Sequence, residues 1–430
     1  MTFSPALTLY RGATAALGPL ARPWLEARAR AGKEDAARLG ERFGEYTQAR
    51  PEGLLMWFHA ASVGESGVAT ALIEALAARH GELSFLLTTG TRTSADLAAK
   101  RAPPRTIHAY APLDRRDAVR KFLAHWRPDA GVFVESELWP NLILEAKAAG
   151  VRLALVNARM SPRTLSRWQA WPAAANILLS PFDWITAADA RTAEALQRLR
   201  DAPVRALGNL KLAAPAPSAD PAAQAALTHE IGARPVWLAA STHAGEDEIV
   251  LAAHRQLRRQ LADALLIVAP RHPERGASVS SLAGNAPRRS LGRPIGDAPV
   301  YVADTLGELG LLYSIAPVAL VAGSLLPTLK GHNPIEPAKI GAAIVTGPHV
   351  ESFQDVFDAL FAIGGARRVG DADALMTAIA SLWRDTPARQ AQISAARTFA
   401  AQGAEAFEAT ATQLAAMIAA KASDAAHASA

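Results

Sequence analysis

Short apolar runs alternate with longer helical stretches along most of the chain, beginning at Leu54. This alternation is typical of a parallel sheet that is covered by helices. The strands predicted in the first half are Leu54–Ala60, Leu83–Thr89, Ala130–Glu135, Arg152–Asn157 and Val204–Leu207. Those predicted in the second half are Val236–Ala240, Leu265–Ala269, Val300–Ala303, Val318–Ala322 and Ala343–Thr346. The sequence therefore predicts an α/β protein with two halves of similar size.

Between the halves, residues 212–225 are rich in proline and alanine and are predicted to form a linker. The expected domains are an N-terminal amphipathic segment (1–35), a first α/β domain (36–211), the linker (212–232), a second α/β domain (233–395), and a C-terminal helix with a mobile tail (396–430). Two α/β domains joined in this way predict a cleft between them, which suits an enzyme that binds one substrate on each domain.

The N-terminal segment carries an apolar stripe at helical spacing. Its members are Phe3, Leu7, Tyr10, Leu17, Leu20 and Trp24, and they are accompanied by Arg11, Arg22, Arg28, Arg30 and Lys33. Two interpretations follow: the helix lies in the headgroup region of an anionic membrane, or it packs its apolar face on its own domain. No run approaches the roughly 18–20 uncharged apolar residues that a membrane-spanning helix needs.

The amino-acid composition excludes several kinds of site and classes of protein. The chain has no cysteine, which excludes disulfides, thiolate metal sites and cysteine nucleophiles. Half of its residues (50%) are hydrophobic, which excludes a mainly disordered chain. The formal net charge is +5, so an anionic partner is expected, such as a nucleotide sugar, an acidic lipid or a nucleic acid.

A candidate general base follows the first predicted strand. The stretch from His59 to Glu65 joins that strand to a helix expected to run through Arg79. Ser62 and Glu65 have the spacing of a capping box, which gives Glu65 a purely structural interpretation. Its place at the carboxyl edge of the sheet also suits a carboxylate that takes a proton from a substrate hydroxyl. These residues alone are compatible with both the structural and the catalytic interpretation of Glu65.

Further charged side chains follow later strands of the first half. Glu135 and Glu137 are two residues apart, so both are expected to point toward the cleft. Glu137 has a second interpretation as a residue that satisfies a helix start, and Trp139 is expected in the core. Arg159 follows the next strand. Lys211 closes the half, where an ammonium group would stabilise negative charge on a leaving phosphate.

The predicted strands of the second half end in polar, glycine-rich turns, the pattern of a nucleotide site along a sheet edge. The sequences of four of these turns are STHAGE, PRHPER, DTLGEL and GHNPIEP. Arg271 supplies a guanidinium suited to phosphate, and Glu336 a carboxylate suited to ribose hydroxyls. The chain has neither a GxGxxG fingerprint nor a P-loop, and Asp371-Ala372-Asp373 is interpreted as a helix start. We therefore expect no metal and no cofactor.

Eight motifs resemble, in order and approximate spacing, those of the 3-deoxy-D-manno-octulosonic acid (Kdo) transferases, a family of lipid A-modifying glycosyltransferases. They are HAASVGE, ESELWPN, NARMS, GNLK, STHAGE, PRHPER, DTLGEL and GHNPIEP. The resemblance extends from about Gly40 to beyond Phe353. It implies the GT-B architecture, with an acceptor-binding and a CMP-Kdo-binding Rossmann-like domain facing across a cleft.

The resemblance also implies a reaction and its residues. Kdo would pass from CMP-Kdo to a hydroxyl of lipid IVA with inversion, releasing CMP, on an anionic membrane surface at the cytoplasmic face of the bacterial inner membrane. Glu65 would be the general base, and Glu135 and Lys211 would stabilise the transition state. The residues implied to bind CMP are Pro270, Arg271, Leu306, Gly307, Glu308, Asn333, Pro334, Ile335 and Glu336. The implied location on the inner membrane favours the interpretation in which the N-terminal segment lies in the headgroup region of a membrane.

Two features depart from the family pattern. The loop Leu325–Lys330 is longer and poorer in glycine than expected, and the N-terminal helix has fewer large apolar residues. Three alternatives stay open: a GT-B transferase that uses a UDP-sugar, a sugar-nucleotide epimerase, and a non-catalytic protein of membrane surfaces or nucleic acids. No nucleic-acid partner is expected, because the basic residues are interspersed with acidic ones.

Overall fold

The computed structural model describes residues 4–213 and 216–429, which divide between two compact units. The first unit extends to residue 213 and resumes at Gln402, and the second unit extends from residue 216 to Ala401. Phe3 of the predicted apolar stripe and residues 214–215 of the predicted linker lie outside the described residues.

The first unit contains a parallel sheet with the strand order β3-β2-β1-β4-β5-β6-β7. Its strands are β1 (Leu55–Ala60), β2 (Ser84–Thr89), β3 (Thr106–Tyr110), β4 (Ala130–Val134), β5 (Arg152–Ala158), β6 (Phe182–Ala187) and β7 (Val204–Ala206). The order reverses between β1 and β4. In doubly wound sheets of this kind, ligands bind beyond the carboxyl ends of the strands at such a switch point.

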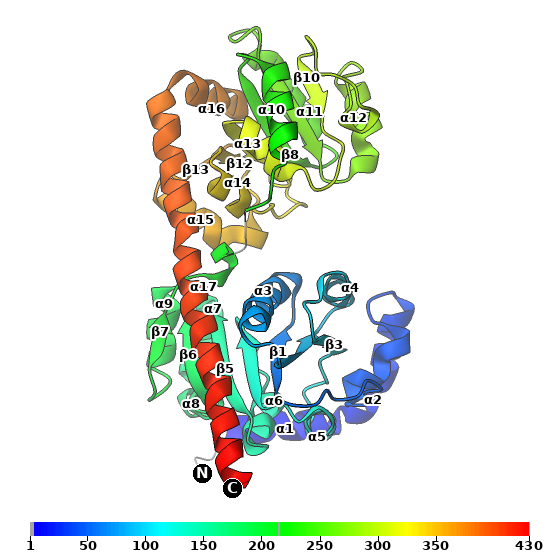
Figure 1. Cartoon of the computed structure of the whole chain (residues 1–430), viewed down its shortest axis with the longest axis vertical. Coiled ribbons are helices and arrows are strands. Elements are labelled where there is room, and N and C mark those ends of the chain that lie inside the picture. Colours follow the sequence, from blue (N-terminus) through cyan, green and yellow to red (C-terminus); the bar gives the residue numbers. More distant parts are fainter. Residues whose placement is uncertain (1–3, 214–215, 430) are drawn as a thin grey trace. The chain divides into compact units, whose positions relative to one another are not determined.

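Helices surround this sheet in the pattern of a Rossmann-like fold (Figure 1). After the N-terminal helices described below, they are α3 (Val63–Arg79), α4 (Arg92–Arg101), α5 (Arg116–Trp126), α6 (Pro140–Ala148), α7 (Pro162–Ala170), α8 (Pro172–Leu179) and α9 (Ala190–Gln197). Two 3-10 segments, η1 (Ala36–Phe43) and η2 (Leu210–Ala213), complete the unit.

The long C-terminal helix α17 (Thr386–Ser429) begins in the second unit and ends in the first. In Figure 1 it is drawn in orange to red. Its buried residues Ala406, Leu414 and Ile418 belong to the same core cluster as α3 and one face of β1, β2, β4 and β5. A segment more than 200 residues away in the sequence therefore covers one face of the first sheet.

Two strands of the first sheet were not among the predicted ones. The edge strand β3 contains Thr106 and His108 and is only half buried, so it lacks the continuous apolar run that marks the central strands. In β6, Asp183 and the half-buried Trp184 interrupt the apolar pattern. Tertiary pairing with β2 and β5, respectively, forms these strands.

The second unit contains a parallel sheet with the order β10-β9-β8-β11-β12-β13. Its strands are β8 (Val236–Thr242), β9 (Leu265–Pro270), β10 (Val300–Val302), β11 (Val318–Val321), β12 (Ala343–Thr346) and β13 (Ala366–Arg368). The switch point lies between β8 and β11. The edge strand β13 was not predicted, because it has three residues and two of them are arginines.

The helices of the second unit again alternate with the strands. They are α10 (Pro221–Ile231), α11 (Glu246–Leu257), α12 (Gly276–Leu282), α13 (Leu309–Ile315), α14 (Ile335–Ile340), α15 (Gln354–Ala362), α16 (Ala372–Arg384) and the first part of α17, with 3-10 segments η3 (Pro273–Arg275), η4 (Arg289–Leu291) and η5 (Glu351–Phe353). Asp371 accepts a hydrogen bond from the Ala374 amide at the start of α16, which confirms the helix-start interpretation of that acidic pair.

The predicted linker is too long. Asp220 caps α10 and Pro221 occupies its first turn, which are standard helix-start residues inside the alanine-rich stretch. Leu227 and Ile231 are buried in the core of the second unit. Residues 221–231 are therefore a helix rather than a connecting segment.

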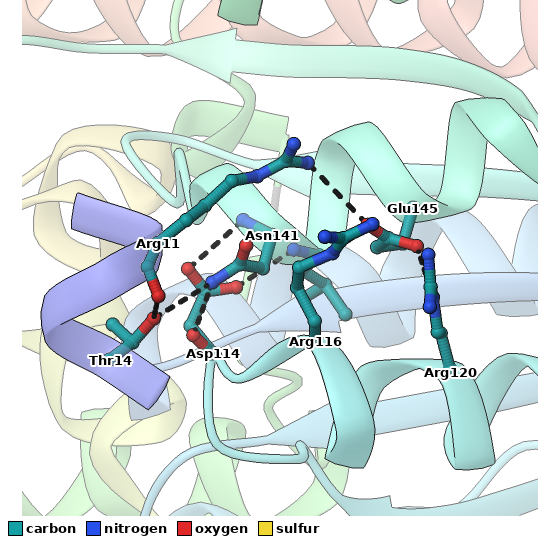
Figure 2. Close-up of polar contacts among 8 residues, drawn as sticks. Arg11, Thr14, Asp114, Arg116, Arg120, Asn141 and Glu145 are labelled. Carbon is teal, nitrogen blue, oxygen red and sulfur yellow. Dashed lines mark hydrogen bonds and ion pairs between the residues drawn. The ribbon is translucent and has the colours of Figure 1, made fainter. Parts of the chain in front are cut away.

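The N-terminal segment forms two consecutive helices, α1 (Pro5–Ala16) and α2 (Gly18–Arg30). Polar contacts dock α1 on the first unit. The Tyr10 hydroxyl donates to Asp114 at 2.8 Å. Arg11 pairs with Glu145 at 3.5 Å, as Figure 2 shows. Asp114 also accepts from the backbone amides of Asn141 and Leu142. Helix α1 therefore contacts its own domain, as one interpretation expected, but it does so through polar contacts, and none of its residues Pro5–Ala16 is fully buried.

The predicted stripe is not buried along its whole length. Leu7 and Tyr10 are half buried, whereas Leu17, Leu20 and Trp24 are 60%, 65% and 55% exposed. Leu9 of α1 is also 75% exposed, whereas Leu25 of α2 is 1% exposed, so both helices have docked and exposed apolar positions.

Candidate active site

Glu65 lies in the first turn of α3, directly beyond the switch-point strand β1. Its Oε2 accepts hydrogen bonds from the backbone amides of Ala61 and Ser62 at 2.6 and 3.1 Å, and the Ser62 hydroxyl accepts from the Glu65 amide at 3.4 Å. The capping box is therefore formed. Its carboxylate still has an unused oxygen, since Oε1 accepts no hydrogen bond from the described residues. Capping and proton abstraction are compatible in this geometry.

Glu135 and Lys211 form an ion pair beside this helix start. The Lys211 Nζ lies 2.6 Å from Glu135 Oε1. A Cβ on Gly64 would lie 3.7 Å from the same Nζ, so the ammonium group approaches the first turn of α3. The three residues expected to take part in catalysis are thus gathered at one switch point.

Asn157, at the end of β5, supports this arrangement. Its Nδ2 donates to Glu135 Oε1 at 3.4 Å, and its Oδ1 accepts from the Leu210 amide at 2.9 Å, next to Lys211. Both Glu135 and Asn157 have positive φ, at 62° and 54°. Asparagine tolerates this left-handed region well, whereas glutamate is unusual there and marks a position held by its surroundings.

Glu137 does not have the helix-start role that one interpretation gave it. Glu135 has left β-strand geometry, so the two-residue alternation does not explain where these carboxylates point. Helix α6 begins at Pro140 without a side-chain cap, so Glu137 does not satisfy that helix start. Instead it accepts from Trp139 Nε1 at 2.5 Å and lies 3.6 Å from Nε2 of the buried His59. Trp139 is 43% exposed and does not belong to the core.

Burial raises the pKa of Glu65 above its ordinary value, and the charges of Glu137 and Glu135 raise it further. The two amide hydrogen bonds oppose this shift. A glutamate with a raised pKa is a stronger proton acceptor when ionised, which is the property that a general base requires. Glu137 has a lowered pKa, because hydrogen bonding to His59 and Trp139 outweighs its burial.

In the second unit, part of the predicted CMP set gathers beyond β9 and β11. Asn333 donates from Nδ2 to Glu336 at 3.3 Å and accepts the Ile335 amide at its Oδ1. Burial raises the pKa of Glu336, while Asn333 and Arg271 lower it. Arg271 is exposed. Pro270, Pro334 and Ile335 have buried side chains, so their contacts with a ligand would come from the backbone.

Of the remaining predicted residues, Leu306 and Glu308 line a separate cavity of about 860 Å³, and Gly307 lies between them in the chain. Leu306 is 77% exposed at its edge. Glu308 forms a two-point ion pair with Arg289, and its pKa is lowered mainly by that hydrogen bonding. Arg289 and Tyr301 in the cavity wall were not singled out in the sequence.

Several residues around these sites carry no sequence signal of their own. His59 and Asn157 lie within matched motifs, but their partners are distant in the sequence. His243 and His332 meet through their Nε2 atoms at 2.9 Å although 89 positions separate them. Only the sheet order brings such pairs together.

Comparison with known proteins identifies the family. The model described as 3-deoxy-D-manno-octulosonic-acid transferase (kdotransferase) matches residues 37–214. A relative from Arabidopsis thaliana, named probable 3-deoxy-D-manno-octulosonic acid transferase, mitochondrial, is 35% identical over 82% of this chain and 82% of its own. The chain belongs to the Kdo transferase family. A Bordetella pertussis relative named 3-deoxy-D-manno-octulosonic acid transferase is also 35% identical and covers 94% of this chain and 97% of its own.

Membership makes this protein a Kdo glycosyltransferase, as the ordered motifs indicated. The crystal structure of UDP-GlcNAc 2-epimerase from Neisseria meningitidis bound to UDP-GlcNAc aligns with a TM-score of 0.55 over 84% of this chain and 99% of that chain. At 12% identity this likeness concerns the fold alone. It agrees with the predicted architecture of two Rossmann-like units, which is confirmed.

The described residues have neither a membrane-spanning helix nor a cluster of metal-ligating side chains. None of the helices at 4–213 and 216–429 is long and apolar enough to cross a membrane. The same residues contain no group of three or more histidine and acidic side chains placed to hold a metal ion.

Proposed function

We propose that this Kdo transferase moves Kdo from CMP-Kdo to a hydroxyl of lipid IVA, with inversion at the anomeric carbon and release of CMP. The observation that carries the proposal is the carboxylate of Glu65. One of its oxygens is fixed by two backbone amides, the other accepts no hydrogen bond from the part of the chain that the structure describes, and an ion pair of Glu135 and Lys211 lies beside it.

Inversion follows from a single displacement. The acceptor hydroxyl attacks the anomeric carbon of Kdo while Glu65 takes its proton, and the bond from that carbon to the phosphate oxygen breaks. The electron pair of the broken bond leaves with CMP. Lys211 would stabilise the negative charge that develops, and Glu135 would hold the lysine in position.

The donor would bind at the carboxyl edge of the second sheet. Arg271 supplies positive charge for the phosphate, and Glu336, fixed by Asn333, supplies a carboxylate for ribose hydroxyls. Pro270, Pro334 and Ile335 would contribute backbone groups. Leu306 and Glu308 would contribute from the wall of the separate cavity, and Gly307 from the turn between them.

We further propose that the protein binds peripherally to the cytoplasmic face of the inner membrane through its N-terminal helices. Leu17, Leu20 and Trp24 offer exposed apolar area. Close to α1, the side chains of Arg11, Arg116 and Arg120 surround the single carboxylate of Glu145 (Figure 2). This excess of positive charge favours an anionic lipid surface.

The test is a turnover assay with lipid IVA and CMP-Kdo generated in situ, with products identified by mass. We expect the acceptor to gain the mass of one or more Kdo units while CMP is released. A folded protein that binds CMP but gives no product would contradict the proposal that lipid IVA is the acceptor. A protein that turns over a UDP-sugar instead would contradict the proposal that CMP-Kdo is the donor.

A further inference from the structure

Two histidines that the proposed mechanism does not use meet at the switch point of the second sheet. His243 follows β8 and His332 follows β11, the strands on either side of that point. Their Nε2 atoms are 2.9 Å apart, and the rings are stacked with an angle of 17° between their planes. In a neutral pair, one Nε2 donates the proton and the other accepts it.

The backbone holds these rings in place. The fully buried carboxylate of Glu246 accepts hydrogen bonds from the amide of His243 and from the three amides of residues 323–325. It thereby ties the start of α11 to the loop after β11. A Cβ on Gly323 would lie 2.5 Å from Cδ2 of His332, so glycine makes room for the ring.

The groups that face the pair are mostly positive. The ring of His272 lies 5.8 Å from that of His243, and Arg271 and Arg275 raise the local positive potential. The nearby carboxylates are already engaged: Glu246 accepts backbone amides, and Asp247 is paired with Arg275. Among the described residues, neither ring of the pair forms an ion pair or hydrogen bond with a carboxylate.

We propose that His243 and His332 together bind an acidic group of the nucleotide-sugar donor, either its phosphate or its sugar carboxylate. The pair would take up one proton as the anion binds and would then donate from both rings. This inference rests on the proposed function, and it assigns to the donor site two residues outside the set implied by the family resemblance. It also agrees with the general rule that ligands bind at the switch points of open α/β sheets.

The lowered pKa values of both histidines in the free protein agree with a pair that takes up a proton only when an anion binds. Burial lowers the pKa of His332 to about 4, and His243, Arg271 and His272 contribute to the shift. The pKa of His243 is also lowered, by burial and then by His272 and the two arginines, against the raising effect of Glu246. The free pair is therefore uncharged near neutral pH. A bound anion raises both pKa values, because it favours the charged form.

The sign of the pH effect follows from linkage. Because the pKa of the pair is higher in the complex than in the free protein, affinity increases as pH falls through the pKa of the complex. A phosphate monoester such as CMP titrates near pH 6 as well. The contribution of the histidine pair is therefore measured as the difference in the pH dependence of CMP affinity between wild type and a variant that lacks one of the two imidazoles.

The experiment measures binding of cytidine and CMP by calorimetry, and the KM for CMP-Kdo, in wild type, His243→Asn and His332→Asn. Cytidine lacks an acidic group, CMP adds the phosphate, and CMP-Kdo adds the sugar carboxylate. His229→Asn, at an exposed position in the last turn of α10, is the matched control. Unchanged cytidine affinity in the variants shows that the nucleoside site is intact.

If the pair binds the phosphate, each variant loses about tenfold to a hundredfold in CMP affinity and part of its pH dependence, while cytidine affinity is unchanged. If the pair binds the carboxylate, CMP affinity is unchanged and the KM for CMP-Kdo rises by a similar factor. Variants that equal wild type with both ligands at every pH would overturn the inference. Failure of wild type itself to bind cytidine or CMP would instead overturn the proposed donor.

Discussion

At the scale of single residues, the environment of Glu65 decides its chemistry. A capping glutamate on an exposed helix would have a lowered pKa, because the amides that it accepts favour the charged form. Here burial and two neighbouring carboxylates raise the pKa, while the capping amides bind only one oxygen. The oxygen Oε2 therefore caps the helix, and Oε1 is the oxygen proposed to take the proton.

Glu65→Gln should lower turnover by roughly 10²–10⁴-fold, because a general base contributes about that factor. CMP affinity should stay within about twofold, since the residues proposed to bind CMP belong to the other unit. Turnover with lipid IVA and calorimetric CMP binding check the two parts. The control is Glu82→Gln, at an exposed position of the first unit. Near-normal turnover of Glu65→Gln would contradict the role of the residue as a base.

The charge of Glu137 should be visible in the pH profile. A general base works when ionised, so kcat/KM falls as pH falls through the pKa of Glu65. Because Glu137 raises that pKa, Glu137→Gln should move the acidic limb of the profile to lower pH. The pH dependence of kcat/KM measures this shift. An acidic limb that stays in place, or moves to higher pH, would contradict the coupling between the two carboxylates.

At the scale of elements, the N-terminal helices combine two functions that the sequence presented as alternatives. Tyr10 and Arg11 dock α1 on the first unit through Asp114 and Glu145. Helix α2 is docked as well, since Leu25 is 1% exposed and Arg115 donates to the Gly18 carbonyl. Its other face carries Leu20 and Trp24, which are exposed. A docked helix with exposed apolar side chains on one face suits binding to a membrane surface.

Replacing both Leu20 and Trp24 by serine should weaken binding to vesicles that contain an anionic phospholipid. Each side chain that leaves the membrane costs about 1.5 kcal/mol or more, so we expect at least a tenfold loss of partitioning per residue. Vesicle cosedimentation measures the loss. Leu291→Ser, at a 60% exposed leucine of the second unit, should bind like wild type. Equal binding of the double variant and this control would contradict the proposed membrane contact.

At the scale of the whole molecule, the two units have the same doubly wound plan, and each brings its polar residues to its own switch point. In the first unit these are Glu65 after β1 and Glu135 after β4. In the second they are His243 after β8 and His332 after β11. The shared plan explains why motifs distant in the sequence form one site in each unit.

The C-terminal helix should stabilise the first unit, although it begins in the second. Leu414→Ala removes a fully buried side chain from the core cluster of the first sheet, which costs about 2–5 kcal/mol. Hydrogen exchange should become faster in β1 and β4 and stay unchanged in β9. Leu282→Ala, at a 48% exposed position, is the control. Faster exchange confined to the second unit would contradict the packing of this helix on the first.

The sequence by itself determined the features that depend on local pattern. Continuous apolar runs predicted the central strands, and Ser62 with Glu65 predicted the start of α3, because an apolar run and a capping box are patterns of neighbouring residues. The ordered motifs predicted the family and the two-unit architecture. The polar or short strands β3, β6 and β13 were not predicted, since they exist only through pairing with a neighbouring strand.

Tertiary structure alone decided the features that depend on distant partners. His243 meets His332 because the second sheet places the non-consecutive strands β8 and β11 side by side at its switch point. Lys211 reaches Glu135 because the segment after the edge strand β7 is held at the end of β5 by the hydrogen bond from the Leu210 amide to Asn157. The positive φ of Glu135 depends on that setting as well. Periodicity records which face of an element is apolar, but it contains no information about which elements become neighbours.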